Sequence, residues 1–129
     1  MENENEMQEV KIKVKGEIEL VKFDIEPYLG KKVKIENVKT MKSQFGYCVK
    51  LETEKLGEWE DTKGDIKEVR ANRIFSLQED KEGNIGWGEK TQLGLFLKKH
   101  KINSLDELKG LEVITQSVTK KDGDFLRFN

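Results

Sequence analysis

The hydrophobic positions between residues 30 and 128 fall in short blocks whose spacing changes along the chain. Apolar and polar residues alternate over residues 32–39 and 47–53, and less regularly over residues 66–77. Such alternation is typical of strands buried on one face. Leu93, Phe96, Leu97 and His100 instead have the spacing of one helix face, which predicts a helix over residues 91–100. Strand-like blocks at 111–119 and 124–128 follow, so the pattern predicts an all-β fold with one main helix, in the order β-β-β-α-β-β.

The segments between these blocks carry turn residues. Residues 54–65 are strongly polar and residues 78–88 contain three glycines, so both are predicted as loops or turns. Ile74 breaks the alternation of the third strand, which predicts a bulge or a strand buried on both faces. Ser104 and Glu107 have the form of a capping box and predict a single helical turn that Gly110 ends. Residues 121–123 predict a tight hairpin turn before the last strand.

A separate alternating pattern precedes this unit. Val10, Ile12 and Val14 alternate with lysines, Gly16 interrupts the pattern, and a second apolar series resumes at Ile18. We interpret residues 10–23 as an N-terminal hairpin or one bent strand added to the main unit. Residues 1–9 contain four Glu and no basic residue and are predicted to be a disordered acidic tip, with residues 10–129 forming a single domain.

Charge and cysteine content narrow the classes of function. The net charge of −1 argues against a protein held to nucleic acid by bulk electrostatics. Without the acidic tip, however, the 24 basic residues face only 21 acidic ones, a net charge of +3. The single cysteine, Cys48, excludes an intramolecular disulfide and is consistent with a reducing compartment. No signal peptide or long apolar run is present, so the expected location is cytoplasmic.

Residues with catalytic or metal-binding chemistry are scarce. One His and one Cys cannot form a zinc cluster, and His100 is interpreted as a residue at the C-terminal end of the helix, where positive charge is favoured. The glycines of residues 83–88 fit neither the dinucleotide-binding nor the phosphate-loop spacing. Clustered carboxylates at Glu58, Glu60 and Asp61 are typical of a solvated loop, although they leave open an enzyme or a metal protein. We therefore expect no enzyme activity, no cofactor and no metal.

Aromatic residues near basic ones offer a more specific pattern. Trp59 and Phe45 lie in polar segments where no apolar periodicity requires them, and strand three and the last hairpin add Arg70, Arg73, Lys120, Lys121 and Arg127. Unpaired bases stack on aromatic rings while cations neutralise phosphates, so this combination favours binding of single-stranded nucleic acid. The alternative is that Tyr47, Phe75, Phe125 and Phe128 form the core and that the basic residues are salt-bridged surface.

The order of elements resembles the OB fold, which has a three-stranded meander, a helix, and a closing strand pair. The resemblance covers residues 31–129 and is one of architecture. It implies a small five-stranded OB-like barrel, carrying the N-terminal strand or hairpin as an extension. It also implies a ligand face on strands two and three, flanked by the loop between strands one and two and the loop between strands four and five. Many OB domains bind single-stranded DNA, so the resemblance implies a face of this kind over residues 42–47, Lys50, Arg70, Asn72, Arg73 and residues 120–121.

These observations together predict non-catalytic binding of single-stranded DNA or RNA. The expected contact residues are Lys42, Phe45, Tyr47, Lys50, Trp59, Arg70, Asn72, Arg73 and Lys121. The alternative is a protein–protein adaptor that uses the same barrel face or pairs its N-terminal strand with the sheet edge of a partner. Salt separates the two hypotheses, because affinity for nucleic acid falls steeply with salt while an apolar protein contact responds weakly.

Overall fold

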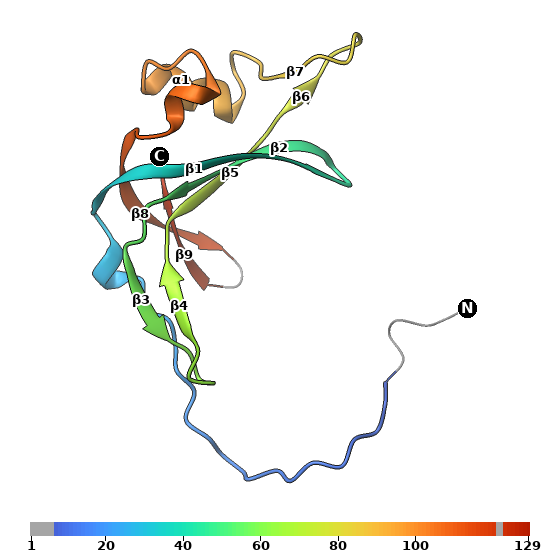
Figure 1. Ribbon diagram of the computed structural model, residues 1–129, viewed down its shortest axis with the longest axis vertical. Helices are drawn as coiled ribbons and strands as arrows, with labels where there is room; N and C mark the ends of the chain where they lie inside the picture. Colours follow the sequence, from blue (N-terminus) through green and yellow to red (C-terminus); the bar gives the residue numbers. More distant parts are fainter. Residues whose placement is uncertain (1–6, 121–122) are drawn as a thin grey trace.

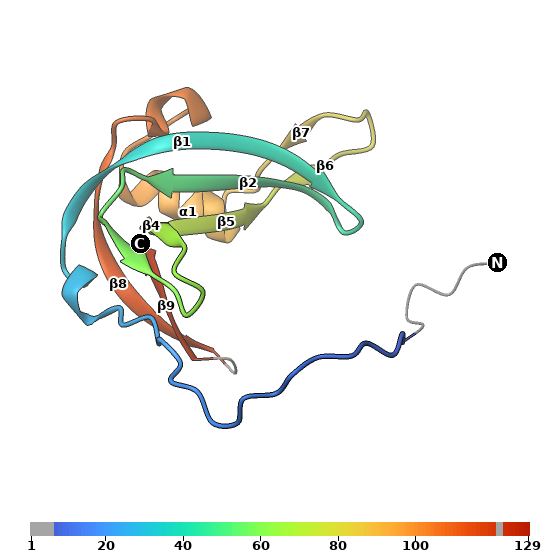
Figure 2. The ribbon, with the colours of Figure 1, turned by 60° about the horizontal axis from the view of Figure 1, so that its bottom comes forward.

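One antiparallel sheet and one α-helix dominate the computed structural model, which describes residues 7–120 and 123–129 (Figure 1). The sheet has the order β5-β2-β1-β8-β9. Its strands are β1 (Lys32–Ser43), β2 (Gly46–Thr53), β5 (Asn72–Ser76), β8 (Glu112–Lys120) and β9 (Gly123–Phe128). The helix α1 (Gln92–Lys99) lies between β5 and β8 in the chain. The predicted mostly-β fold with one main helix is therefore confirmed, and Figure 2 shows how strongly the sheet curves.

The core forms where the inward faces of these strands meet the apolar face of α1. Alternate residues of β1 and β2 are buried, and Phe75 of β5 and Phe128 of β9 are 1% and 0% exposed. Phe96 of α1 packs between them, with ring centroids 5.2 Å from Phe75 and 6.2 Å from Phe128. Residues from both ends of the strand order thus contact one helix, so the sheet wraps around its core. Within the described part of the chain, no helix is long and apolar enough to cross a membrane.

The helix begins where the sequence predicts it. Thr91 is its N-cap and accepts a hydrogen bond from the backbone N–H of Gly94, while His100 is its C-cap. The single turn η2 (Leu105–Leu108) also forms where predicted. Its cap differs from the predicted capping box, because the Ser104 side chain makes no capping bond and Glu107 accepts from the backbone of Asn103.

The predicted N-terminal strand or hairpin over residues 10–23 is wrong. The structure assigns no strand between residues 7 and 31, where the only element is the short 3-10 helix η1 (Glu26–Tyr28). Residues 7–24 are exposed and form a long arm that curves away from the rest of the molecule (Figure 1). Val10, Ile12 and Val14 alternate with polar residues as in a strand, but in the structure they are exposed and pair with no sheet edge. The first six residues of the predicted acidic tip lie outside the described residues.

Both predicted loops take part in small hairpins, the first together with the start of the predicted third strand. Strands β3 (Gly57–Glu60) and β4 (Ile66–Val69) form one, and β6 (Gln78–Glu79) and β7 (Ile85–Gly86) form the other. The two turns have the same construction. The Asp61 carboxylate accepts hydrogen bonds from the backbone of Lys63 and Asp65, and the Asp80 carboxylate accepts them from Glu82 and Asn84. Each turn then places a glycine in the left-handed region, at φ +84° for Gly64 and +83° for Gly83.

The predicted third strand is divided into β4 and β5. Val69 pairs with Gly57 of β3, whereas Asn72 pairs with Glu52 of β2, so the chain changes partner at residues 70–71. Thr53 anchors this change, because its hydroxyl accepts from the backbone N–H of Ala71. The predicted irregularity at Ile74 is wrong: Ile74 keeps a regular register opposite Lys50 and is exposed. The register shift in this part of the sheet lies in β1, between Ile35 and Asn37.

Candidate nucleic-acid interface

A basic groove runs between β5 and the β8–β9 hairpin. It has a volume of about 490 Å³, and no Asp or Glu among the described side chains lines it. The lining residues are Phe23, Ile25, Arg70, Asn72, Arg73, Ile74, Gln92, Val118, Lys120, Phe125, Leu126 and Arg127. In a chain with 25 acidic residues and a net charge of −1, this groove concentrates positive charge. Such a local concentration attracts anionic ligands even when the whole molecule does not.

Arg73 is held at the side of this groove nearest the core. It lies opposite Leu51 in the sheet register, so it projects from the same face of β5 as Phe75. Its guanidinium lies 4.5 Å from the Phe75 ring centroid and donates a hydrogen bond to the Phe128 carbonyl at 3.1 Å. Burial and the nearby charge of Arg127 lower the pKa of Arg73, but an arginine stays charged at neutral pH. A bound anion would stabilise these two guanidinium groups, which repel each other.

The β8–β9 hairpin provides the opposite wall. Phe125 is 43% exposed, and the ammonium of Lys120 lies 5.5 Å from the centroid of its ring. Arg127 donates a hydrogen bond to the Asn129 side chain at 3.3 Å. Neither Lys120 nor Arg127 forms an ion pair with a carboxylate of the described residues. The hairpin therefore contributes an accessible ring and two available cations.

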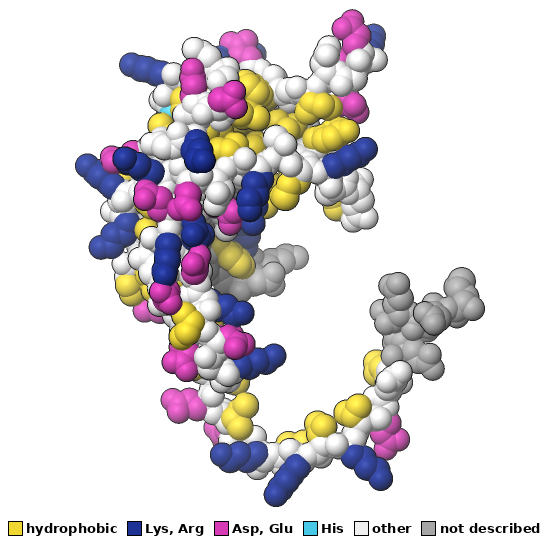
Figure 3. Space-filling view, viewed as in Figure 1, with side chains coloured by type: hydrophobic (Ala, Val, Ile, Leu, Met, Phe, Trp, Pro, Cys, Tyr) yellow, Lys and Arg dark blue, Asp and Glu magenta, His cyan; other side chains and the backbone are white. Residues whose placement is uncertain are grey.

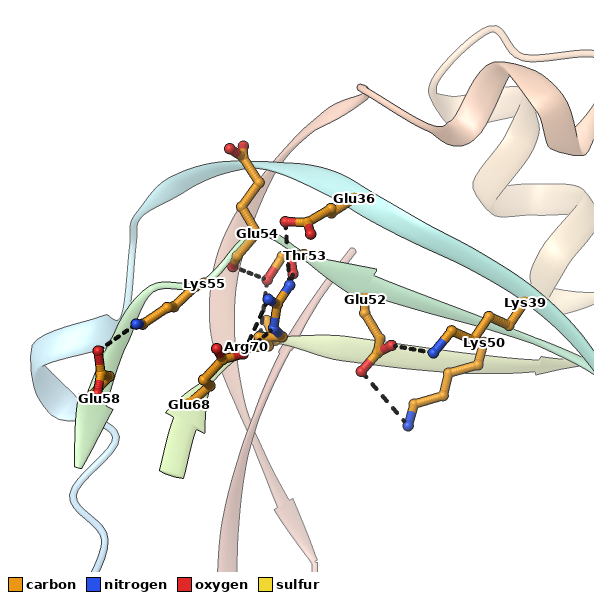
Figure 4. A network of polar contacts seen from close by, with 11 residues as sticks. Glu36, Lys39, Lys50, Glu52, Thr53, Glu54, Lys55, Glu58, Glu68 and Arg70 are labelled. Carbon is orange, nitrogen blue, oxygen red and sulfur yellow. Dashed lines mark hydrogen bonds and ion pairs between the residues drawn. The ribbon is translucent and has the colours of Figure 1, made fainter. Parts of the chain in front are cut away.

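Arg70 and Lys50, both predicted contact residues, are paired with carboxylates (Figure 4). Arg70 bridges Glu68 at 3.1 Å and Glu36 at 3.3 Å, and it donates to the Thr53 carbonyl at 3.0 Å. The hydrogen bond to Glu68 is the largest cause that raises the pKa of Arg70. Lys50 lies 3.9 Å from Glu52, which also pairs with Lys39. The structure thus gives Arg70 a role in joining strands, and both residues already have carboxylate partners.

A second aromatic cluster forms at the β1–β2 turn. Phe45 is 90% exposed, and the ammonium of Lys42 lies 5.2 Å from the Tyr47 ring centroid. Both ribbon views place this turn apart from strands β8 and β9 (Figures 1 and 2). The outer face of β2 and β5 lies between the two clusters, where Lys50 is opposite Ile74 and Glu52 is opposite Asn72. Asn72 is exposed there and also lines the groove. The predicted residues Lys42, Phe45 and Tyr47 therefore lie together, at a distance from Arg73.

Trp59 belongs to a separate aromatic cluster. It lies in β3, half-buried, with its ring centroid 5.1 Å from that of Phe23, and Phe23 in turn stacks on Tyr28 at 5.9 Å. The indole is therefore folded back onto the protein rather than displayed to solvent. Its contacts attach the end of the N-terminal arm to the β3–β4 hairpin. The last predicted contact residue, Lys121, lies outside the described residues.

Groups with other chemistry are isolated. No cluster of three or more His, Cys, Asp or Glu side chains in the described part of the chain could hold a metal ion. Cys48 is a half-buried free thiol on β2. His100 packs on Phe96 at 4.6 Å, and burial lowers its pKa. Its place at the helix C-terminus is as predicted, but its environment favours the neutral imidazole over the expected positive charge.

Phe125 and Arg127 are residues of the groove that the sequence does not single out as contact residues. The sequence leaves Phe125 as a core candidate, yet among residues 125–128 of this strand only Phe128 is fully buried. Phe125 and Phe128 are three positions apart and therefore point to opposite faces of the strand, but the sequence alone does not say which of the two faces the core. The basic residues Lys120 and Arg127, which lie near Phe125 in the sequence, are the signal that could have identified it as a contact residue. Comparisons with protein-family models, with curated proteins and with solved structures found no match for this chain.

Proposed function

We propose that this protein binds single-stranded nucleic acid without catalysis, in the groove between β5 and the β8–β9 hairpin. The observation that carries the proposal is the lining of that groove. Arg73, Lys120 and Arg127 supply positive charge, Phe125 supplies an exposed ring, and no described carboxylate opposes them. Phosphates need such cations, and unpaired bases need such rings.

An OB-like barrel is the architecture we propose for this binding face. Strands β1, β2 and β5 form a meander, α1 follows, and β8 and β9 form the last pair. In the order β5-β2-β1-β8-β9, the two edge strands run parallel to each other. The hydrogen bond from Arg73 to the Phe128 carbonyl joins them and supports closure between β5 and β9. The groove then lies where the OB fold binds ligands, beside strands two and three of the barrel and the loop between strands four and five.

In this proposal the strand follows the groove and continues over the outer face of β2 and β5. Arg73, Lys120 and Arg127 contact phosphates, while Phe125 stacks on a base and Asn72 offers hydrogen bonds to a base edge. Phe45 and Tyr47 offer a second place for stacking at the β1–β2 turn, beside Lys42. Because only Arg73, Lys120 and Arg127 supply unpaired charge in the groove and the net charge is −1, we expect modest affinity with a marked dependence on salt.

The experiment is a fluorescence anisotropy titration of a labelled, unstructured single-stranded oligonucleotide at several salt concentrations. The test variant is the double substitution Lys120→Gln with Arg127→Gln. Its matched control is Lys90→Gln with Lys109→Gln, which removes the same charge from exposed positions outside the groove. We expect only the test variant to weaken binding. The slope of log affinity against log salt should fall by about 0.7 for each phosphate that the variant no longer neutralises.

A second substitution isolates stacking from charge. Phe125→Ala should weaken binding by about 1–3 kcal/mol if a base stacks there, with the salt slope unchanged. If the test and control double variants lose affinity equally, charge acts without a defined site, and binding in the groove is refuted. Absence of any binding at low salt would refute nucleic-acid binding and leave the adaptor hypothesis.

A further inference from the structure

The exposed N-terminal arm has the composition of a strand. Val10, Ile12, Val14, Ile18 and Leu20 are 56–78% exposed, although they alternate with charged residues as in a half-buried strand. Figure 3 shows these yellow side chains along the arm, interleaved with blue lysines, away from the rest of the surface. Contiguous apolar exposure of this kind marks a site of interaction with another molecule.

The backbone of the arm is also available for pairing. Among the described residues, Val21 is the first whose backbone N–H donates to another residue, at 2.8 Å to the Thr62 hydroxyl. Phe23 then packs on Trp59, and Ile25 is 8% exposed. The arm is therefore fixed to the protein from Val21 onward, while residues 7–20 keep their backbone groups free for a strand partner.

The charges of the arm identify that partner as a second copy of this chain. Residues before Gly16 are basic at Lys13 and Lys15, and residues after it are acidic at Glu17 and Glu19. Two arms that run antiparallel and cross at Gly16 place Lys15 opposite Glu17 of the second copy, and Lys13 opposite Glu19 of the second copy. Opposite charges in directly facing positions stabilise a strand pair.

The same register aligns the apolar residues. Val14 faces Ile18 of the second copy and Ile12 faces Leu20 of the second copy, so one face of the ribbon is apolar and the other carries the ion pairs. Shifting the register by two residues places Lys15 opposite Lys15, or Glu17 opposite Glu17. Parallel pairing in register places every charge opposite its like. The antiparallel register centred on Gly16 is therefore favoured over its neighbours.

A hairpin within one chain would form the same residue pairs less favourably than two chains do. The pairs Val14–Ile18 and Lys13–Glu19 would require a three-residue loop of Lys15, Gly16 and Glu17. Hairpin loops of that length place the left-handed glycine last, whereas Gly16 would be central. The structure assigns no turn at Gly16, whose φ is +119°. Pairing between two molecules needs no loop.

We propose that residues 12–20 of two copies form an antiparallel two-stranded ribbon, with a two-fold axis at Gly16. The interface is isologous, so each copy gives and receives the same contacts. Because a two-stranded ribbon alone is marginally stable in water, its formation depends on concentration and on packing of its apolar face.

The test uses charge-reversed arms and sedimentation velocity over a range of protein concentrations. Lys13→Glu with Lys15→Glu makes the paired positions of the arm wholly acidic, and Glu17→Lys with Glu19→Lys makes them wholly basic. We expect the wild type to form dimers and each variant alone to remain monomeric. An equimolar mixture of the two variants should form heterodimers, because every facing pair is then complementary again. The four substitutions combined should restore the homodimer with the wild-type composition.

The control is Lys90→Glu with Lys109→Glu, which lowers the net charge by the same amount as Lys13→Glu with Lys15→Glu but outside the arm, and should leave the dimer intact. The arm lies outside the core, and unfolding monitored by tryptophan fluorescence should show that all variants fold equally well. A wild type that stays monomeric at every concentration overturns the proposal. A dimer that survives either double reversal also overturns it, since the ribbon would not be its interface.

Discussion

At the scale of single residues, some basic side chains of this region are paired with carboxylates and others are not. Arg70 is surrounded by Glu36, Glu68 and the Thr53 carbonyl, so its charge is used within the protein. Arg73 has only aromatic rings, the Phe128 carbonyl and the Asn129 side chain as partners among the described residues, and Arg127 adds a second positive charge beside it. The two arginines lie three positions apart in the sequence, yet only Arg73 keeps a charge that a ligand can neutralise.

His100 gives a prediction about pH. Burial lowers its pKa in the folded chain, and a hydrogen bond to the Asn129 backbone only partly opposes this. Because the unfolded chain has an ordinary His pKa near 6.5, it binds a proton that the folded chain does not. The contribution of His100 to stability is therefore complete above about pH 6.5 and falls as the pH is lowered through that value.

Urea unfolding followed by tryptophan fluorescence between about pH 7.5 and 5.5 measures this effect. The free energy of unfolding of the wild type should decrease across the interval, whereas that of His100→Gln should change less. Equal pH dependence in the two proteins would contradict a neutral, buried imidazole.

At the scale of elements, α1 depends on a close approach between its first turn and the preceding loop. A Cβ at Gly94 would lie 2.8 Å from the Glu89 carbonyl oxygen and closer still to that of Gly88. The Gly88 carbonyl cannot move easily, because it accepts hydrogen bonds from both the backbone and the hydroxyl of Thr91. The helix begins at this contact, which only a glycine permits.

Gly94→Ala should therefore destabilise the protein despite its better helix propensity. The propensity gain is about 1 kcal/mol, while forcing an extra methyl group against fixed backbone costs about 1–3 kcal/mol. We expect a lower free energy of unfolding in urea. Leu95→Ala is the control on the exposed face of the same helix, and its effect should stay within about 0.5 kcal/mol. A more stable Gly94→Ala protein would show that the loop yields and that the contact is not restrictive.

The elements that the sequence predicts correctly are those with local signals. The helix has an apolar face and a Thr cap within ten residues, and β1 and β2 have regular alternation. The two hairpins that the sequence analysis did not predict also have a local signal, since Asp61 and Asp80 each begin the same Asp-X-X-Gly turn, followed by Asp65 or Asn84. That repeated turn is present in the sequence, but its composition is equally typical of a loop without strands.

Other features could not be predicted because they depend on distant partners. The arm over residues 10–20 has the alternation of a strand, but no sequence pattern states whether a sheet edge is available to it. The division between β4 and β5 results from Thr53, which lies 18 residues before Ala71. The carboxylates that pair with Arg70 likewise come from two strands, Glu36 from β1 and Glu68 from β4. Aromatic and basic residues can be identified from the sequence, but their grouping into one groove and one separate turn cannot.

At the scale of the whole molecule, the two proposals, binding in the groove and pairing through the arm, together predict bivalent binding. If two copies join through their arms, each dimer presents two grooves, and a strand that reaches both is held at a high effective concentration. Avidity of this kind raises affinity by about 10²–10⁴ without further interactions, provided that the strand spans both sites. An oligonucleotide that fills one groove has no such advantage.

The charge-neutral variant Val14→Pro with Ile18→Pro tests this, because proline removes the backbone donors that a strand pair needs. Anisotropy titrations should give equal affinities of wild type and variant for a short oligonucleotide. For a lengthening series, the affinity of the wild type should rise above a threshold length and that of the variant should not. A variant whose affinity rises as much would show that the grooves act singly. A wild-type dimer with no length dependence would show that its two grooves cannot be reached by one strand.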